Sequence, residues 1–117
     1  MANNLHITYS LNAPAQNQEA VIQQIKNLGN WGRINEVCWY VKSRHTARQA
    51  ADAIRAVMKP KDSIYVVDSA NNQAAWHNIP DEVSALIRDQ WNKYAEASAS
   101  SGFMAQQQKY IDELAHY

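Results

Sequence analysis

The amino-acid sequence predicts an α+β fold, and three observations carry this prediction. Segments with the two-residue alternation of strands are interleaved with segments whose apolar residues recur at helical spacing. The strongest strand signal, SIYVVD at 63–68, comes directly after a helical segment. The chain has 117 residues, which suits one small domain with its own core. We therefore expect a sheet that packs against helices.

The first strand is predicted at residues 5–11, where apolar and polar side chains alternate. Pro14, after Asn12 and Ala13, is typical of a first helical turn. A helix is predicted over 15–28, because one of its faces carries Val21, Ile22, Ile25 and Leu28. We expect Gly29 to end this helix as the residue just beyond it.

The middle of the chain contains a strand region and a second helix. Residues 33–42 are either two short strands or one strand broken near Glu36, because their first half is polar and their second half is aromatic and β-branched. The sequence Thr46-Ala47-Arg48-Gln49 matches a capping box and predicts a helix start. The inward side of that helix is expected to carry Ala47, Ala50, Ala51, Ile54, Val57 and Met58.

After the strand at 63–68, Asn71-Asn72 signals a turn. Residues 74–79 are predicted as a short edge strand or a loop. Acidic residues at 81 and 82 favour a helix start there. Its apolar stripe consists of Val83, Leu86, Ile87, Trp91 and Tyr94. A break at 98–102 precedes a weaker helical stripe of Phe103, Tyr110, Ile111 and Leu114.

The order of these elements is β-α-β(β)-α-β-(β) followed by two helices, and its first part matches ferredoxin-like domains. We therefore expect one domain, with a ferredoxin-like core at 1–80 and a helical extension at 81–117. The alternative is a small parallel α/β sheet, if residues 33–42 form a single strand. In either fold one sheet face is left for the terminal helices or a second subunit to cover.

Composition excludes several classes of protein. Eleven basic and eleven acidic residues cancel, so the chain as a whole has no electrostatic attraction for nucleic acid. The single cysteine, Cys38, excludes an internal disulfide framework and a multi-cysteine metal site. No apolar run predicts a membrane span, and the first residues have no signal-peptide pattern. We expect a cytoplasmic protein with no membrane contact.

A locally basic stretch is the first candidate binding site. It comprises Lys42, Arg44, Arg48, Arg55, Lys59 and Lys61, opposed by Asp52 alone. Arg48 and Asp52 are four residues apart on a helix, so part of this charge is expected on a solvated, salt-bridged face. The functional interpretation is a patch for phosphate or an acidic partner, which Arg33 and Arg44 could join.

A second candidate lies just after the strand at 63–68. Polar and aromatic groups at strand ends can form a ligand site. The other interpretation is a turn built from Asp and Asn, with Trp76 packed on the core. The binding residues predicted from both candidates are Arg33, Arg44, Arg48, Asn71, Asn72, Trp76 and His77.

The residues alone predict no catalytic group, metal site or cofactor. None of the four histidines has a metal-ligand spacing to another. Cys38 lies within a predicted strand, with no neighbouring charge that would activate its thiol. With three glycines in all, a glycine-rich phosphate loop is excluded.

Several runs carry a resemblance to known proteins: LHITYSLNAP, LGNWGRINEVCWYV, TARQAADAIRAVMKPKDSIYVVD and NNQAAWHNIPDEVSALIRDQW. Over residues 5–92 the chain resembles small bacterial proteins labelled "SinR family", which are not helix-turn-helix repressors. More distantly, residues 5–79 resemble the ferredoxin-like small subunit of CRISPR adaptation complexes and VapD-type ribonucleases. This resemblance implies a homodimer in which a short fourth or fifth strand pairs with the partner subunit.

In the nuclease-like relatives an aspartate ends the first strand and helps to hold a divalent metal. The matching position here is Ser10, and a hydroxyl is a poor substitute for a carboxylate around Mg²⁺. We therefore expect a non-catalytic homodimeric binding protein. The resemblance implies an accessory or inhibitory role in bacterial defence, phage or mobile-element conflict.

Two alternatives stay open at this point. One is a VapD-type endoribonuclease that uses Mg²⁺ or Mn²⁺ with Asp68, Ser10 and Asn12. The other is a small-nucleotide-binding protein that uses Arg44, Asn71, Asn72 and Trp76.

Overall fold

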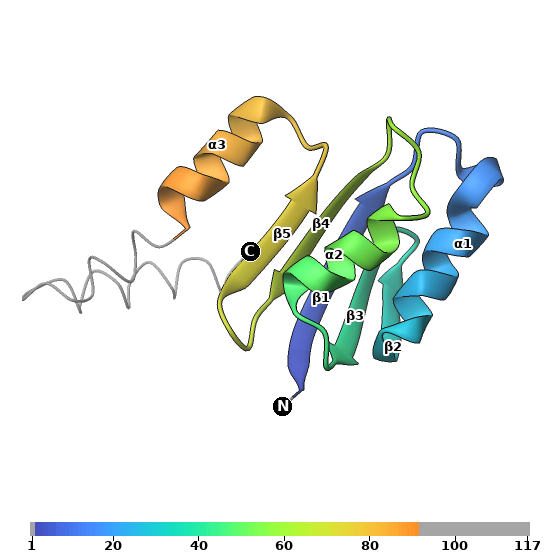
Figure 1. The fold of residues 1–117 in the computed structure, drawn as a ribbon, viewed down its shortest axis with the longest axis horizontal. Coiled ribbons are helices and arrows are strands. Elements are labelled where there is room, and N and C mark those ends of the chain that lie inside the picture. The colour runs from blue at the N-terminus through green and yellow to red at the C-terminus, as the bar shows by residue number, and fades with distance from the viewer. Residues whose placement is uncertain (1, 92–117) are drawn as a thin grey trace, which may run out of the picture. The chain divides into compact units, whose positions relative to one another are not determined.

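A computed structural model of the chain describes residues 2–91. Its elements in chain order are β1 (Asn3–Ser10), α1 (Pro14–Asn27), β2 (Gly29–Asn35), β3 (Cys38–Ser43), α2 (Ala47–Arg55), β4 (Ser63–Asp68), β5 (Gln73–His77) and α3 (Asp81–Gln90) (Figure 1). The α+β prediction is confirmed. The weaker helix predicted at 103–114 lies outside the described residues.

Two compact units divide the chain. Residues 1–79 form the first and contain the whole sheet, and residues 80–117 form the second and contain α3.

The sheet has five strands in the order β2-β3-β1-β4-β5, and every neighbouring pair is antiparallel. The parallel alternative is therefore wrong. Residues 29–43 form two strands joined by a tight turn, so β2 and β3 are a hairpin, and an antiparallel pair needs no helical crossover. β1 lies at the centre, where Leu5 is opposite Val41 on one side and Asp68 on the other.

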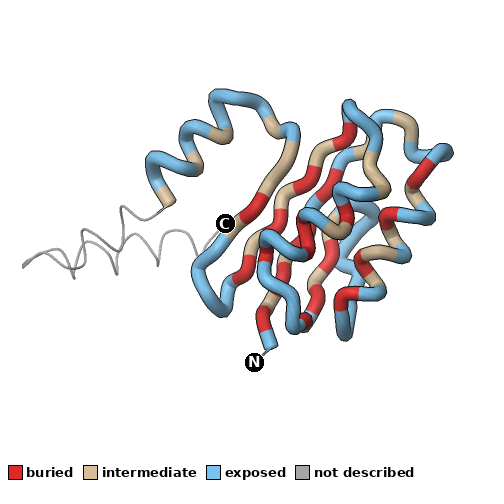
Figure 2. The backbone as a smooth tube through the Cα atoms, in the orientation of Figure 1, coloured by how far each residue is buried: buried red, intermediate tan, exposed pale blue. Residues whose placement is uncertain are grey.

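Helices α1 and α2 lie over the same face of the sheet (Figure 1). The strands alternate between buried and more exposed residues, most regularly in β1 and β4 (Figure 2). This alternation places one set of side chains under the helices and the next set on the opposite face. The core under the helices is formed mainly by Leu5, Ile7, Val21, Ile25, Trp39, Val41, Ile54, Ile64 and Val66.

Helix α2 begins as the capping box predicted. The Thr46 side chain accepts a hydrogen bond from the Gln49 amide, and the Gln49 side chain accepts one from the Thr46 amide, both at 3.0 Å. Three alanines of α2 are buried, which lets its backbone approach the sheet closely. The helix ends earlier than predicted, at Arg55. Val57 and Met58 follow it and pack against the core from the loop.

Gly29 was predicted to lie just beyond the end of α1, and the structure places it there, because Leu28 is the C-cap of the helix. α1 ends at Asn27, and Gly29 is the first residue of β2, opposite Ser43. A Cβ at Gly29 would overlap the backbone carbonyl oxygen of Lys42, so the close approach of the two strands requires glycine here. The predicted strand began only at 33 because residues 29–32 have no apolar alternation, and all of β2 is exposed.

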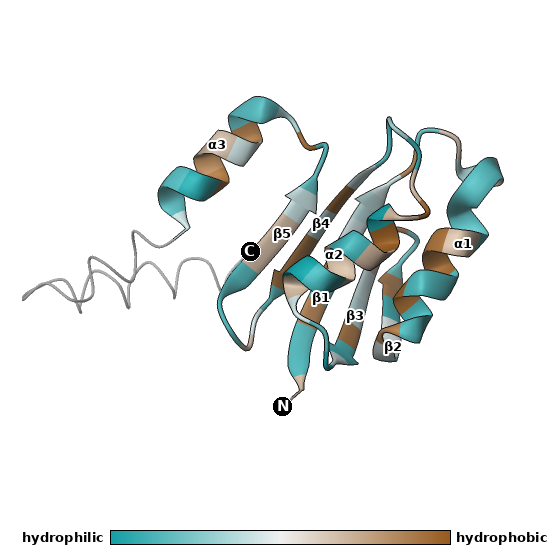
Figure 3. Ribbon diagram, in the orientation of Figure 1, coloured by the Kyte–Doolittle hydropathy of each residue, from teal (hydrophilic) through white to brown (hydrophobic). Residues whose placement is uncertain are grey.

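Helix α3 belongs to the second unit. Asp81 and Glu82 occupy its first turn, where the helix dipole favours acidic side chains. Hydrophobic segments recur along it (Figure 3), yet it buries none of its residues. Val83 is 43% exposed and Leu86 is 58% exposed. None of the helices in the described part of the chain is long and apolar enough to cross a membrane.

Candidate functional site

The sheet face opposite α1 and α2 is the most distinctive surface of the first unit. Its residues alternate with the core residues along β3, β1, β4 and β5, which are neighbours in the sheet. We call it the aromatic face, and it consists of Asn4, His6, Thr8, Ser10, Cys38, Tyr40, Lys42, Ser63, Tyr65, Val67, Ala74 and Trp76.

Two pairs of rings lie on this face. His6 and Tyr40 are opposite each other on β1 and β3, with ring centroids 5.6 Å apart. Tyr65 and Trp76 are opposite each other on β4 and β5, with ring centroids 6.2 Å apart. All four side chains are half-buried. Each pair therefore contributes both to cross-strand packing and to the surface.

Hydrogen bonds fix the first ring pair in place. The Tyr40 hydroxyl donates to Asn4 Oδ1 at 2.6 Å. The His6 Nε2 atom is 3.0 Å from Ser69 Oγ, in the turn after β4. In the second pair, burial raises the pKa of Tyr65 above its ordinary value of 10.0, so its hydroxyl stays protonated well beyond physiological pH.

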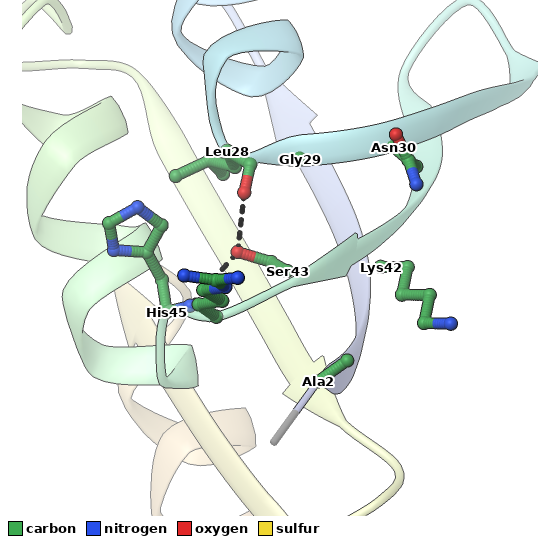
Figure 4. Close-up of a pocket in the computed structure, with 8 residues that line it drawn as sticks. Ala2, Leu28, Gly29, Asn30, Lys42, Ser43 and His45 are labelled. Carbon is green, nitrogen blue, oxygen red and sulfur yellow. Dashed lines mark hydrogen bonds between the residues drawn. The ribbon is translucent and has the colours of Figure 1, made fainter.

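A hollow of about 350 Å³ opens at the end of the sheet where β3 ends and β2 begins. Its lining consists of Ala2, Leu28, Gly29, Asn30, Lys42, Ser43, Arg44 and His45 (Figure 4). Lys42 belongs both to this lining and to the aromatic face. We call this the cationic hollow, because its titratable lining residues are a lysine, an arginine and a histidine and none is acidic. Within residues 2–91, Lys42 and Arg44 form no ion pair.

A chain of hydrogen bonds holds the loop that carries Arg44 and His45. Ser43 Oγ donates to the Leu28 carbonyl at 2.6 Å and accepts from the His45 amide at 3.0 Å (Figure 4). Asn3 Nδ2 donates to the His45 carbonyl at 2.8 Å. Asn71 Nδ2 donates to Asn3 Oδ1 at 2.7 Å. The wall of the hollow is thus fixed by contacts from four separate segments.

Buried Asp68 holds the last residue of this series of hydrogen bonds, Asn71. Its carboxylate accepts from the Asn4 amide at 3.1 Å, from the Ala70 amide at 3.0 Å and from Asn71 Nδ2 at 2.6 Å. These donors satisfy the negative charge inside the protein. Asn71 therefore helps to hold the loop at the hollow indirectly, because it donates to Asn3, which in turn donates to the His45 carbonyl.

The structure does not bring the predicted basic residues together. Arg44 lines the hollow. Arg33 lies further along the hairpin, opposite Trp39, with its guanidinium 4.9 Å from that ring. Arg48 is exposed on α2, 3.4 Å from the carboxylate of Asp52, as the salt-bridge interpretation expected. Of these three arginines, Arg44 is the one that lines the cationic hollow.

The predicted residues after β4 also separate. Asn71 is used in the network described above, and Asn72 lies in the predicted turn with a positive φ of 53°, which asparagine tolerates. Trp76 lies on the aromatic face beside Tyr65, whereas His77 is opposite Ile64 and so is on the helix side of the sheet. Sequence alternation alone could have separated Trp76 from His77, since they are adjacent in a strand.

The residues of the nuclease alternative lie apart. Asp68 is opposite Leu5 near the start of β1, whereas Ser10 is opposite Ser63 at the other end of that strand. These positions are five residue steps apart along β1, which is roughly 17 Å. Asn12 lies beyond Ser10, and its amide donates to a different carboxylate, that of Asp62, at 2.8 Å. In the described part of the chain, no three histidine, cysteine or acidic side chains gather as metal ligands would.

Comparison of the chain with protein-family models, with curated proteins and with solved structures finds no match.

Proposed function

We propose that the protein is a non-catalytic, homodimeric binding protein whose aromatic face contacts a protein or a nucleotide-containing partner. The observation that carries the proposal is this face itself. It joins four half-buried rings to hydroxyl and amide side chains on one side of a five-stranded sheet. Aromatic residues with a polar atom at the edge are enriched where proteins bind partners.

The proposal includes a ferredoxin-like fold for the core. The β-α-β-β-α-β connectivity, with β1 between β3 and β4, supports a ferredoxin-like core to which β5 adds an edge strand. An edge strand is a natural site for pairing with a second copy. A cytoplasmic role in bacterial defence, phage or mobile-element conflict is the version that the "SinR family" and VapD-like resemblance implies.

Ser10 supports the non-catalytic part of the proposal. It stands where the resemblance implies a metal-binding aspartate, and the one carboxylate assigned to the nuclease alternative, Asp68, is already committed to three donors. A carboxylate that accepts three hydrogen bonds has few acceptor sites left for a metal ion.

Two measurements on the full chain test the proposal. Light scattering should give a mass near twice the 13.3 kDa of one chain, and a monomer mass at all concentrations would contradict the dimer. Incubation with mixed RNA and Mg²⁺ or Mn²⁺ should give no cleavage. Cleavage that EDTA stops and that an Asp68→Asn variant with a native circular dichroism spectrum lacks would instead establish the nuclease.

The cationic hollow favours a second candidate, a small-nucleotide-binding protein. The cationic side chains of Lys42 and Arg44, with the imidazole of His45, line a hollow of about 350 Å³ that can receive a phosphate group. Calorimetry against a panel of mononucleotides tests it. Saturable heat that Arg44→Ala removes and Arg48→Ala retains would support this candidate, and flat traces would remove it.

A further inference from the structure

The two ring pairs of the aromatic face are spaced so that each can hold a separate planar group. Tyr40 on β3 and Tyr65 on β4 flank the central strand β1, so they lie two strand spacings apart, roughly 10 Å across the sheet. The hydrogen bond from the Tyr40 hydroxyl to Asn4 orients the Tyr40 ring before any partner binds. A ring that is already ordered loses little entropy when a base stacks on it.

The charges around these rings complement a polyanion. None of the described residues of the aromatic face is acidic, and its charged side chain is Lys42. Lys42 continues into the cationic hollow, where Arg44 and His45 join it. The net charge of the whole chain is zero, but the charges are unevenly distributed. The residues of this face include no carboxylate, and basic side chains lie at one end of it.

We propose that the aromatic face binds a single-stranded nucleic acid, with bases stacked on the Tyr40 and Tyr65 rings and a phosphate of the same strand in the cationic hollow. This inference rests on the proposed function, because it names the partner of the same face. Unpaired bases offer flat π-faces to aromatic side chains, and an open sheet is a known platform for them. In a duplex the base faces are stacked on one another, so double-stranded nucleic acid cannot stack its bases on these rings.

Fluorescence anisotropy tests the inference with the full chain and labelled decamers of uridine and of thymidine. We expect saturable binding of at least one decamer at low salt, and weaker binding of the matching duplex. Comparing the two decamers shows whether the sugar hydroxyl contributes. The absence of binding to both, or equal binding to a duplex, would overturn the inference.

Matched variants locate the site. Tyr65→Leu should lower the affinity by about tenfold or more, whereas Tyr65→Phe keeps the ring and should stay within about twofold. Lys42→Ala alters an exposed side chain, so its fold is not at risk, and it should reduce the slope of log affinity against log salt by about 0.7. Arg48→Ala, on the helix side, should change neither quantity. Equal effects of Lys42→Ala and Arg48→Ala would contradict the assigned face.

Light scattering on the same samples separates this inference from the proposed function. A dimer mass without oligonucleotide binding overturns the inference alone. If Tyr65→Leu abolishes the dimer mass while the unaltered chain binds no oligonucleotide, the aromatic face is a subunit interface, and the inference is again overturned. A monomer that binds the decamers supports the inference and contradicts the dimer.

Discussion

At the scale of single residues, two buried carboxylates join segments that are far apart in the sequence. Asp68 ties the turn after β4 to the start of β1, as described above. Asp62 lies between α2 and β4 and is fully buried. It accepts from the Asn12 amide at 2.8 Å, from Asn17 Nδ2 at 2.9 Å and from the Lys59 amide at 2.8 Å. It therefore fixes the start of α1 to the loop after α2.

Asp62→Asn should destabilise the protein. Burial disfavours the charged form of Asp62, but its three N–H donors outweigh burial and hold its pKa below the ordinary value of 3.8. A hydrogen-bonded charge of this kind contributes about 2 kcal/mol. We expect the free energy of unfolding, measured with urea at pH 7, to fall by about that amount.

The pH dependence of this effect has a definite sign. Because the folded pKa is lowered, the stabilisation is present above pH 3.8 and is lost as the pH falls through the folded pKa. The difference between Asp62→Asn and the unaltered chain should therefore shrink when urea unfolding is repeated below that pH. Asp52→Asn, which alters an exposed ion pair, is the control and should change stability little. A loss for Asp62→Asn that is the same at both pH values would argue against this assignment.

Two glycines of β2 provide a matched pair of substitutions. Gly29→Ala places a Cβ against the Lys42 carbonyl oxygen, which belongs to the paired strand and cannot move freely. We expect a loss of about 1–3 kcal/mol in the free energy of unfolding. Gly32→Ala adds a Cβ with no atom within 4 Å and should stay within about 0.5 kcal/mol. Equal effects of the two substitutions in urea unfolding would contradict the strand pairing at Gly29.

Some single residues could be assigned from the sequence, and others could not. Alternation of apolar and polar side chains correctly predicted the first strand, in which His6 lies on the opposite face from Leu5 and Ile7. Asp62 was missed, because its donors Asn12 and Asn17 are 50 and 45 residues away. Nothing local to a sequence such as Lys-Asp-Ser signals partners at that distance.

At the scale of elements, the strength of the local pattern decided what could be predicted. β4 has regular alternation and was predicted with its observed bounds, Ser63–Asp68. β2 is exposed along its whole length and consists largely of polar residues and glycine, so its first half was missed. Pairing with β3 holds these residues in a strand, and their own sequence has little strand propensity.

The start of α2 gives a prediction at this scale. Thr46→Ala removes the acceptor of the Gln49 amide and should lower the free energy of unfolding by about 1 kcal/mol. Thr46→Ser retains a hydroxyl at the same place and should preserve most of the stability. Thermal unfolding followed by circular dichroism measures both. A Thr46→Ser variant as unstable as Thr46→Ala would show that the methyl group, and not the cap, stabilises this helix.

At the scale of the whole molecule, the order of elements was enough to predict an α+β sheet but not the candidate site. The cationic hollow is lined from the chain start, from the α1–β2 junction and from residues 42–45. The aromatic face combines four strands in an order that the sequence does not state. Sequence reasoning singled out Arg44 and Trp76 separately. It grouped Arg44 with Lys42 in one basic stretch, but it could not place them at the α1–β2 junction, or Trp76 beside Tyr65.

The division at residue 79 gives the last prediction. Every buried hydrophobic residue of the described chain lies between Leu5 and Ala75, and α3 contributes none. A chain that ends at Ile79 keeps that core and all five strands, so it should unfold cooperatively in urea with a midpoint close to that of the full chain. Three tryptophans remain to report the transition: Trp31, Trp39 and Trp76. Loss of the cooperative transition would show that residues 80–117 stabilise the sheet. A native transition with a halved light-scattering mass would assign the subunit contact to them.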